Sequence, residues 1–209
     1  MKRIIISDNQ YYLNAFTNIN CSKTVTSDLA FVVNSAVYDG AIVIVNITDN
    51  AAMLKILDEL IKMNILKIFV EQFQWPRRVK LTSLSNIYIL PGRMDIDQFL
   101  ETIEKCLLSL SDVVQIRPDR VRGSEWITML YLMSGISNRH LAQILNTSEK
   151  TISGRMNSLS IKMGLTGLNK ATQLIAMNFF YLIYISTKPV AERRYFTRIQ
   201  RDILESVSK

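Results

Sequence analysis

The polar residues between positions 149 and 163 have the types and the spacing to contact nucleic acid. On a helix of about 3.6 residues per turn they share one face, made of Lys150, Ser153, Gly154, Asn157, Ser158 and the apolar Ile161, with Arg155 and Lys162 at its flanks. Asparagine and serine side chains hydrogen-bond to base edges, and lysine and arginine pair with phosphates. Gly154 costs a helix about 1 kcal/mol relative to alanine, as expected where a backbone approaches a groove or a neighbouring helix closely. An ordinary solvated amphipathic helix explains the pattern equally well.

Helices on both sides of a short break are predicted to position this face. The back of the helix is a narrow apolar stripe of Ile152, Met156, Leu159 and Met163. A helix from Ser124 stops at Gly135, and a second helix begins after Ser137 and ends near Asn146. Ser148 or Thr147 then caps the helix that carries the polar face, and Glu149 lies in its first turn, where the helix dipole favours an anion. The order is that of a helix-turn-helix.

The sequence gives little support to catalysis or to metal binding. His140 is the only histidine in the chain, and it accompanies no activated nucleophile, metal cluster or phosphate loop. We therefore predict that the protein is not an enzyme and has no cofactor or metal. No small-molecule substrate is evident from the sequence. Cys21 and Cys106 form no CxxC motif, and the first residues do not resemble a signal peptide. Both features lead us to expect a cytoplasmic protein.

Charge divides the 209 residues into two halves. Residues 1–120 contain 13 Lys+Arg and 13 Asp+Glu, whereas residues 121–209 contain 12 Lys+Arg and 5 Asp+Glu and account for the whole net charge of +7. The second half is therefore predicted to bind an anionic partner. Charge alone does not distinguish nucleic acid from a membrane surface.

Residues 121–185 resemble the LuxR/FixJ-type helix-turn-helix family. The family's core reads roughly G-L-S-N-K-E-I-A, then L-x-I-S-E-K-T-V-K-x-H, then K-L-G-V. The residues that match it outright are Gly135, Ser137, Asn138, Ala142, Leu145, Ser148, Glu149, Lys150, Thr151, Lys162 and Gly164. The conservative matches are Ile136, Arg139, Leu141, Ile152, Met163 and Leu165, and Glu125 matches a glutamate of the family's first helix.

The resemblance implies a role for each of these positions on double-stranded promoter DNA. By analogy, Lys150, Thr151 and Arg139 hold phosphates. The family's base-reading positions correspond to Ser153, Gly154 and Asn157. The family usually has lysine where this chain has Ser153 and histidine where it has Arg155. The target sequence should therefore differ, or specificity should be weak, and Arg155 is a candidate for a restored phosphate contact.

Residues 1–110 are predicted to form an α/β domain. Five strands are expected at residues 3–7, 24–26, 41–47, 66–70 and 87–90, and five helical segments at residues 11–19, 28–38, 50–64, 73–86 and 95–110. This alternation predicts a doubly wound, five-stranded parallel sheet with helices on both faces. The segment 73–86 has the weakest pattern of the ten.

The order and length of these elements resemble the receiver domain of bacterial response regulators. That family holds Mg²⁺ with an acidic pair, phosphorylates an aspartate, and contacts the phosphoryl group with a hydroxyl and a lysine. The corresponding positions here are Asp8, Asn9, Asn46, Glu71 and, displaced, Arg93. An amide is no nucleophile, so we predict a non-functional phosphorylation site in a scaffold that pairs with other proteins. A phosphorylated domain or a small-ligand-binding domain is the rival interpretation.

The remaining segments complete the domain prediction. Residues 111–120 contain Pro118 and a polar cluster and are expected to be a linker. A fourth helix at 169–185 has about 17 residues without charge, the short limit for a membrane span, but Gln173 and Asn178 favour a packed or dimerising helix. Residues 186–209 read as a basic helix, with Tyr195, Ile199 and Ile203 on one side. It either packs on the domain, contacts the DNA backbone or binds a partner.

Together the two resemblances imply an atypical, RcsA-like auxiliary regulator of transcription. We expect it to bind promoter DNA independently of phosphorylation, either as a homodimer or with another LuxR-type response regulator. No membrane partner is expected. The alternative is a protein-interaction module that titrates a response regulator and has no productive DNA binding of its own.

Overall fold

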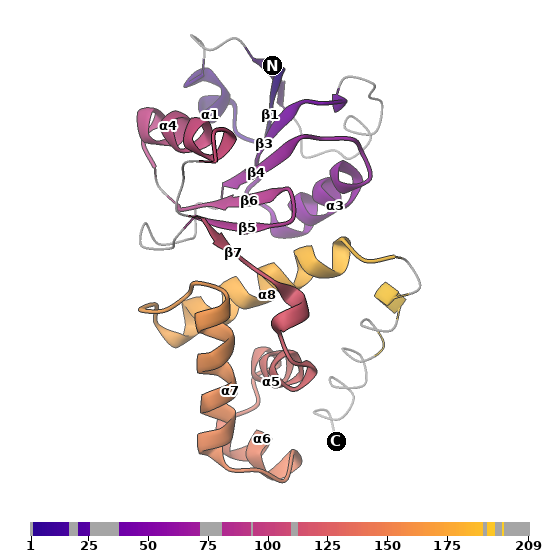
Figure 1. The fold of residues 1–209 in the computed structure, drawn as a ribbon, viewed down its shortest axis with the longest axis vertical. Helices are drawn as coiled ribbons and strands as arrows, with labels where there is room; N and C mark the ends of the chain where they lie inside the picture. The colour runs from indigo at the N-terminus through magenta and orange to yellow at the C-terminus, as the bar shows by residue number, and fades with distance from the viewer. Residues whose placement is uncertain are drawn as a thin grey trace. The chain divides into compact units, whose positions relative to one another are not determined.

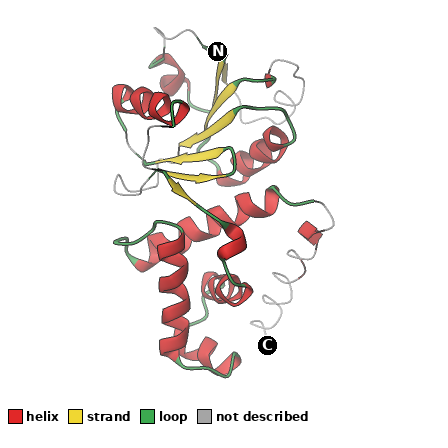
Figure 2. Cartoon of the chain, viewed as in Figure 1, coloured by secondary structure: helices red, strands yellow, loops and turns green. Residues whose placement is uncertain are grey.

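The structure is a computed structural model (Figures 1 and 2). In it the chain divides into two compact units, Met1–Gln115 and Ile116–Lys209. The structure describes residues 2–16, 21–25, 38–71, 81–92, 94–109, 113–189, 192–194 and 198. Each unit is described separately below.

A seven-stranded, mostly parallel sheet forms the centre of the first unit. Its strands are β1 (Arg3–Ser7), β2 (Ser22–Val25), β3 (Ile42–Asn46), β4 (Lys67–Glu71), β5 (Thr82–Leu84), β6 (Ile87–Leu90) and β7 (Val114–Gln115). Their order in the sheet is β2-β1-β3-β4-β6-β5-β7, and only the β5–β6 pair is antiparallel. Strands β1 and β3 are in register from the Arg3–Ile42 pair to the Ser7–Asn46 pair. Parallel pairing brings the ends of these strands to one edge of the sheet.

The expectation of a purely parallel, five-stranded sheet was wrong. The five predicted strands form β1 to β4 and β6, but β5 lies inside the segment 73–86 that was expected to be helical. Ser85, with φ of 56°, and Asn86 form a tight turn that folds β5 back along β6. Two-residue turns with positive φ connect antiparallel strands. Strand β7 then adds to β5 from within the segment expected to be a linker.

Helices cover both faces of the sheet (Figure 1). Helices α1 (Gln10–Asn14) and α4 (Ile96–Leu107) cover one face, and α3 (Asn50–Ile61) covers the other. The core beneath α1 and α4 includes Phe16, Phe69 and Phe99. Asp95 caps α4 by accepting a hydrogen bond from the Gln98 N–H at 2.8 Å. The helix expected at 28–38 lies outside the described residues except for Tyr38.

The second unit is helical. It contains the short 3₁₀ helix η2 (Pro118–Arg120) and helices α5 (Gly123–Met133), α6 (Asn138–Ile144), α7 (Glu149–Lys162) and α8 (Lys170–Ser186). Ser137, Ser148 and Asn169 cap α6, α7 and α8, and the side chain of each accepts a hydrogen bond from the backbone N–H of the residue three positions later. These bonds satisfy amide donors that have no partner within the helix. Short breaks at residues 134–137, 145–148 and 163–169 separate α5, α6, α7 and α8.

Aromatic packing joins α8 to α5. The ring of Trp126 lies 5.1 Å from that of Tyr181 and is stacked at 6.0 Å on that of Tyr184. Beyond α8, Arg193 donates hydrogen bonds to the carbonyls of Lys188 and Ser186 at 2.6 Å each. Tyr195, Ile199 and Ile203, the expected apolar side of the tail helix, lie outside the described residues. Among the helices that are described, none has both the length and the hydropathy to cross a membrane.

Candidate nucleic-acid interface

Helix α7 carries the candidate face on a well-packed back. Ile152, Leu159 and Met163 are completely buried. Ile152 packs with Ile136, Leu141 and Ala142 in a core shared with α6. Met156, the fourth residue of the predicted stripe, is only partly buried. Packing of three of these four side chains fixes which face of α7 points outward.

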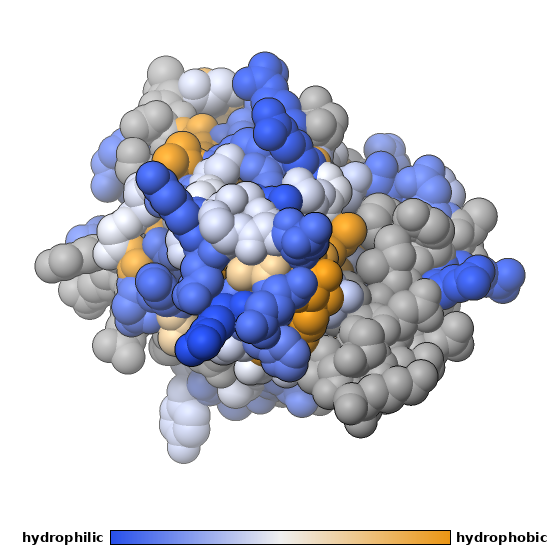
Figure 3. Space-filling view, turned by 90° about the horizontal axis from the view of Figure 1, so that it is seen from below, coloured by the Kyte–Doolittle hydropathy of each residue, from blue (hydrophilic) through white to orange (hydrophobic). Residues whose placement is uncertain are grey.

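The outward face is polar and open. Lys150, Thr151, Ser153, Gly154 and Asn157 are all exposed. A Cβ atom added at Gly154 would meet nothing within 4 Å, so this glycine does not serve a close approach to a neighbouring helix. Figure 3 shows the molecule from below, with hydrophilic side chains dominating that face and hydrophobic patches between them. The front of α7 therefore offers hydrogen-bonding and cationic groups to a large partner.

Helix α6 adds two further groups from the sequence analysis. Arg139 is exposed and belongs to the first turn of α6. His140 is also exposed, and its backbone N–H donates to the Ser137 hydroxyl at 3.2 Å. Arg139 is thus free to approach a phosphate, and His140 has the surface position that the sequence suggested.

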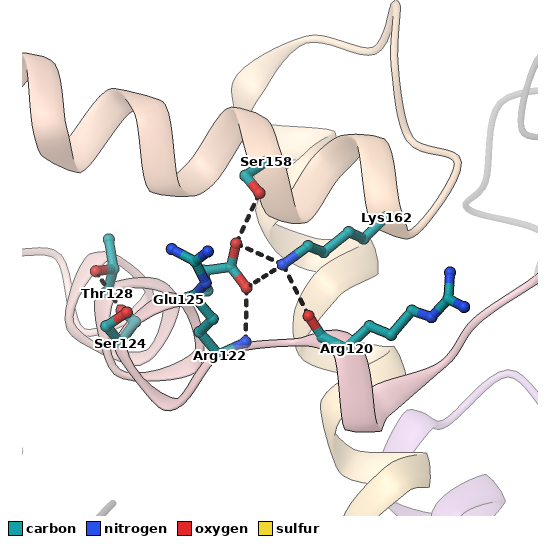
Figure 4. Close-up of polar contacts among 7 residues, drawn as sticks. All are labelled: Arg120, Arg122, Ser124, Glu125, Thr128, Ser158 and Lys162. Carbon is teal, nitrogen blue, oxygen red and sulfur yellow. Dashed lines mark hydrogen bonds and ion pairs between the residues drawn. The ribbon is translucent and has the colours of Figure 1, made fainter.

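The other flank of α7 contacts α5. Ser158 donates a hydrogen bond to Glu125 Oε1 at 2.7 Å, and Lys162 Nζ lies 2.8 and 2.6 Å from the two carboxylate oxygens of Glu125 (Figure 4). Lys162 also donates to the Arg120 carbonyl at 2.9 Å. Arg155 makes a longer contact of 3.5 Å with the Thr128 hydroxyl. The structure therefore separates these three residues from the open face.

Glu125 is the centre of this network, which sequence reasoning missed. Its side chain is only 4% exposed, and it accepts a further hydrogen bond from the Arg122 backbone N–H at 2.7 Å. Burial alone would raise the pKa of Glu125, but the hydrogen bonds from Lys162, Ser158 and Arg122 outweigh it and lower the pKa. Glu125 and Lys162 are 37 residues apart in the sequence, so no local spacing of residues reveals that they interact.

Asp8 and Asn9, the two predicted receiver-like positions directly after β1, are both engaged in hydrogen bonds. Asp8 Oδ2 accepts from the Thr48 N–H at 2.9 Å, and Asp8 Oδ1 accepts from the Thr48 hydroxyl at 3.2 Å. Asn9 caps α1, where its side chain accepts from two backbone N–H groups. Asp8 therefore bonds to the segment after β3, whereas Asn9 bonds to the start of its own neighbouring helix.

The buried part of this cluster lies at the ends of β3 and β4. Asn46 accepts from the Ser7 hydroxyl at 3.4 Å and donates to Glu71 Oε2 at 3.3 Å. Tyr12 donates to the same oxygen at 2.6 Å. Burial raises the pKa of Glu71, although both hydrogen bonds lower it, and burial beside Glu71 raises the pKa of Tyr12 well above its ordinary value. A neutral amide and a buried carboxylate thus meet at the two positions that were predicted to correspond to the receiver family's phosphoacceptor and hydroxyl.

Arg93, the fifth receiver-like position, lies outside the described residues. The described residues contain no group of three histidine, cysteine, aspartate or glutamate side chains that could hold a metal ion.

Two solved structures share the fold. One is described as the two-component response regulator RcsB in complex with DNA; it is 18% identical, has a TM-score of 0.52 and covers 87% of this chain and 98% of that chain. The other contains two RcsB dimers bound to two parallel DNAs; it is 15% identical, has a TM-score of 0.51 and covers the same shares, 87% and 98%. No protein-family model and no curated protein matches the sequence. Over most of its length the chain has the fold of these response regulators.

Proposed function

We propose that the protein is a bacterial transcription regulator that binds promoter DNA through the open face of α7. The observation that carries the proposal is the arrangement of α7 itself. Ile152, Leu159 and Met163 anchor its back, while Lys150, Ser153, Gly154 and Asn157 remain exposed on its front. Exposed amide and hydroxyl groups match base edges, and the cation matches phosphate. In this proposal Thr151 and Arg139 add phosphate contacts.

The contacts of α7 refine the proposed set of DNA-binding residues. Ser158 and Lys162 are hydrogen-bonded to Glu125, so we assign them to holding α7 against α5. Arg155 lies on the same flank but has only the 3.5 Å contact with Thr128. It remains a candidate phosphate contact, since a small rotation of its side chain would release it.

We further propose that phosphorylation does not control this DNA binding. Asn46 has an amide where the receiver family has its nucleophile, and it is hydrogen-bonded to the buried Glu71. A phosphoryl group there would meet a carboxylate rather than a hydroxyl and an ammonium group, which would raise its energy. Regulation would then come from the amount of protein and from its partner, which is a second copy or another response regulator.

Paired alanine substitutions on the open face test the proposal. Lys150→Ala with Asn157→Ala removes one phosphate contact and one base contact, so the affinity for a site selected from random-sequence DNA should fall at least a hundredfold, about 1.4 kcal/mol for each tenfold loss. Fluorescence anisotropy measures this affinity, and circular dichroism checks the fold. Lys105→Ala with Asn14→Ala removes the same groups from exposed positions in the first unit and should leave the affinity unchanged. Unchanged binding by the Lys150/Asn157 variant would rule out the open face.

The second candidate function is a module that titrates a response regulator. Ser153 favours it, because this position lacks the lysine usual in the family. Such a module would co-purify with a response regulator and lower that regulator's DNA binding without touching DNA itself. A complex that retains both proteins on promoter DNA would exclude this candidate.

A further inference from the structure

The second unit contains a cavity of about 480 Å³ beside the open face of α7. Its walls come from the end of α5 and the following turn, from the first turn of α6, from α7, and from the first turns of α8. Cavities that bind small molecules have volumes of roughly 300–1,000 Å³. This one has the size for a compact organic molecule.

The interior of the cavity is largely apolar. Its apolar side chains are Leu132, Ile136, Met156, Leu168 and Leu174. Met156 lines the cavity and is therefore partly exposed, whereas the other three residues of the α7 stripe are completely buried. A ligand that covered Met156 and its apolar neighbours would remove apolar surface from water, which favours binding.

Polar side chains also line this cavity. Ser137 and Asn138 come from the start of α6, Ser153 and Asn157 from α7, and Gln173 from α8. Of the described residues that line it, Lys170 is the only one with a charge, and it is exposed at the start of α8. Apolar walls with a single cation suit an apolar body that ends in one negative charge. Phosphate diesters of DNA would gain little from the apolar walls.

We infer that this cavity binds a small amphipathic carboxylate, with its hydrocarbon part against Met156 and its carboxylate at Lys170. Ser153 and Asn157 belong both to the cavity wall and to the open face of α7. A bound carboxylate therefore shares two residues with DNA, and the two ligands compete. The competition rests on the proposed function, whereas the binding of the carboxylate does not.

Methyl NMR of the full chain tests the cavity directly. Octanoate is the probe, used below its micelle-forming concentration, and 1-octanol is the uncharged probe of equal length. The ¹³C-methyl signal of Met156, assigned with Met156→Leu, should shift in a saturable way, while that of the buried Met163 should stay in place. No shift at Met156, or equal shifts at both methionines, would overturn the inference.

Two variants test the assignment of the ligand's ends. Lys170→Met should weaken octanoate binding at least tenfold and leave 1-octanol binding unchanged, and the control Lys105→Met should change neither. Leu174→Trp should fill the cavity and weaken both probes. Equal octanoate affinity in the wild type and in Lys170→Met would refute the carboxylate assignment.

A DNA titration tests the competition. Octanoate at ten times its wild-type Kd should raise the apparent Kd for DNA about elevenfold, and in Lys170→Met the same concentration should raise it about twofold or less. Unchanged DNA affinity at saturating octanoate would refute the competition. If the ligand-free protein did not bind DNA at all, the proposed function would fail, while the NMR result would still decide whether the cavity binds a carboxylate.

Discussion

Glu125 and Lys162 show how single residues set the geometry of the candidate interface. Glu125 is buried on α5 and holds the C-terminal end of α7 through Lys162 and Ser158. Lys162 also reaches the Arg120 carbonyl, so one ammonium group ties α7 to both α5 and the segment before it. A buried carboxylate without its cation is costly, since it has lost water and has no opposite charge.

Removal of this cation should destabilise the second unit. Lys162→Met leaves Glu125 buried and unpaired, and we expect the unfolding free energy to fall by roughly 3 kcal/mol. The double variant Glu125→Gln with Lys162→Met should lose less than the two single losses combined. Hydrogen exchange of the α5 and α7 amides measures these values. Arg155→Met, which removes a cation from the same flank, should change stability by about 0.5 kcal/mol or less; an equal loss there would refute the special role of Lys162.

The lowered pKa of Glu125 fixes the direction of the pH effect. Its carboxylate is stabilised in the folded state, so the stabilisation is fully present above the ordinary glutamate pKa of about 4.3 and is lost as the pH falls through the lower folded pKa. The exchange protection of α5 and α7 should therefore decrease in acid in the wild type. Glu125→Gln should flatten this decrease.

At the scale of the element, contacts on two sides hold α7 in place and leave a third side exposed. One flank is bonded to α5, the back is packed against α6, and the front is open. Gly154 stands in the open front with nothing near its missing Cβ. Within the free protein this glycine only weakens the helix, and we propose that it allows α7 to approach DNA closely.

Gly154→Ala should therefore separate stability from binding. We expect alanine to stabilise the second unit by about 1 kcal/mol, because the added methyl group meets no protein atom. The same methyl group should lower DNA affinity at least tenfold by keeping α7 from the groove. Thermal unfolding and fluorescence anisotropy measure the two effects. Gly123→Ala, also at an open position on a helix, is the control for binding; DNA affinity that survives Gly154→Ala would place the contact elsewhere on α7.

The sequence predicted elements better than it predicted pairings. The β-branched run that forms β3 and the caps Ser137 and Ser148 are local signals, because each depends on neighbouring residues. Strand β5 has only three residues and depends on its pairing with β6, which no local pattern indicates. The ion pair between Glu125 and Lys162 also joins residues far apart in the sequence, so no local pattern predicted it.

The candidate interface shows the same limit. Periodicity placed Ser153, Gly154 and Asn157 on one face of a helix, and all three are exposed. It also placed Ser158 on that face and Lys162 at its flank, although both contact α5. Met156 followed the apolar spacing, yet it borders a cavity. Helical spacing fixes the direction of a side chain, and only the packing of other helices decides what it meets.

At the scale of the whole molecule, the first unit has a mostly parallel sheet whose predicted receiver-like positions are occupied by hydrogen bonds within the unit. Asp8 binds Thr48, and Asn46 and Tyr12 bind Glu71. In the receiver family that the sequence resembles, the positions predicted to correspond to these residues must be available to Mg²⁺ and phosphate. We therefore attribute to this unit a role in pairing with another protein rather than in phosphoryl transfer.

Acetyl phosphate tests this role on the full chain. After incubation with acetyl phosphate and Mg²⁺, intact-mass spectrometry should show no added phosphoryl group, because Asn46 is not a nucleophile and Glu71 repels the anion. A response regulator that accepts phosphate under the same conditions is the positive control. Addition of one phosphoryl group would refute the proposal that the unit is inert.

The dependence of DNA affinity on salt tests the central claim most directly. A protein that pairs lysine and arginine with phosphates releases counterions, so the logarithm of its binding constant falls linearly with the logarithm of the salt concentration. We predict such a line for the wild type, and a slope smaller by about 1 for Lys150→Ala, which loses one phosphate contact. The control Lys105→Ala should keep the wild-type slope. A flat line for the wild type, or equal slopes for the wild type and Lys150→Ala, would contradict DNA binding through the open face of α7.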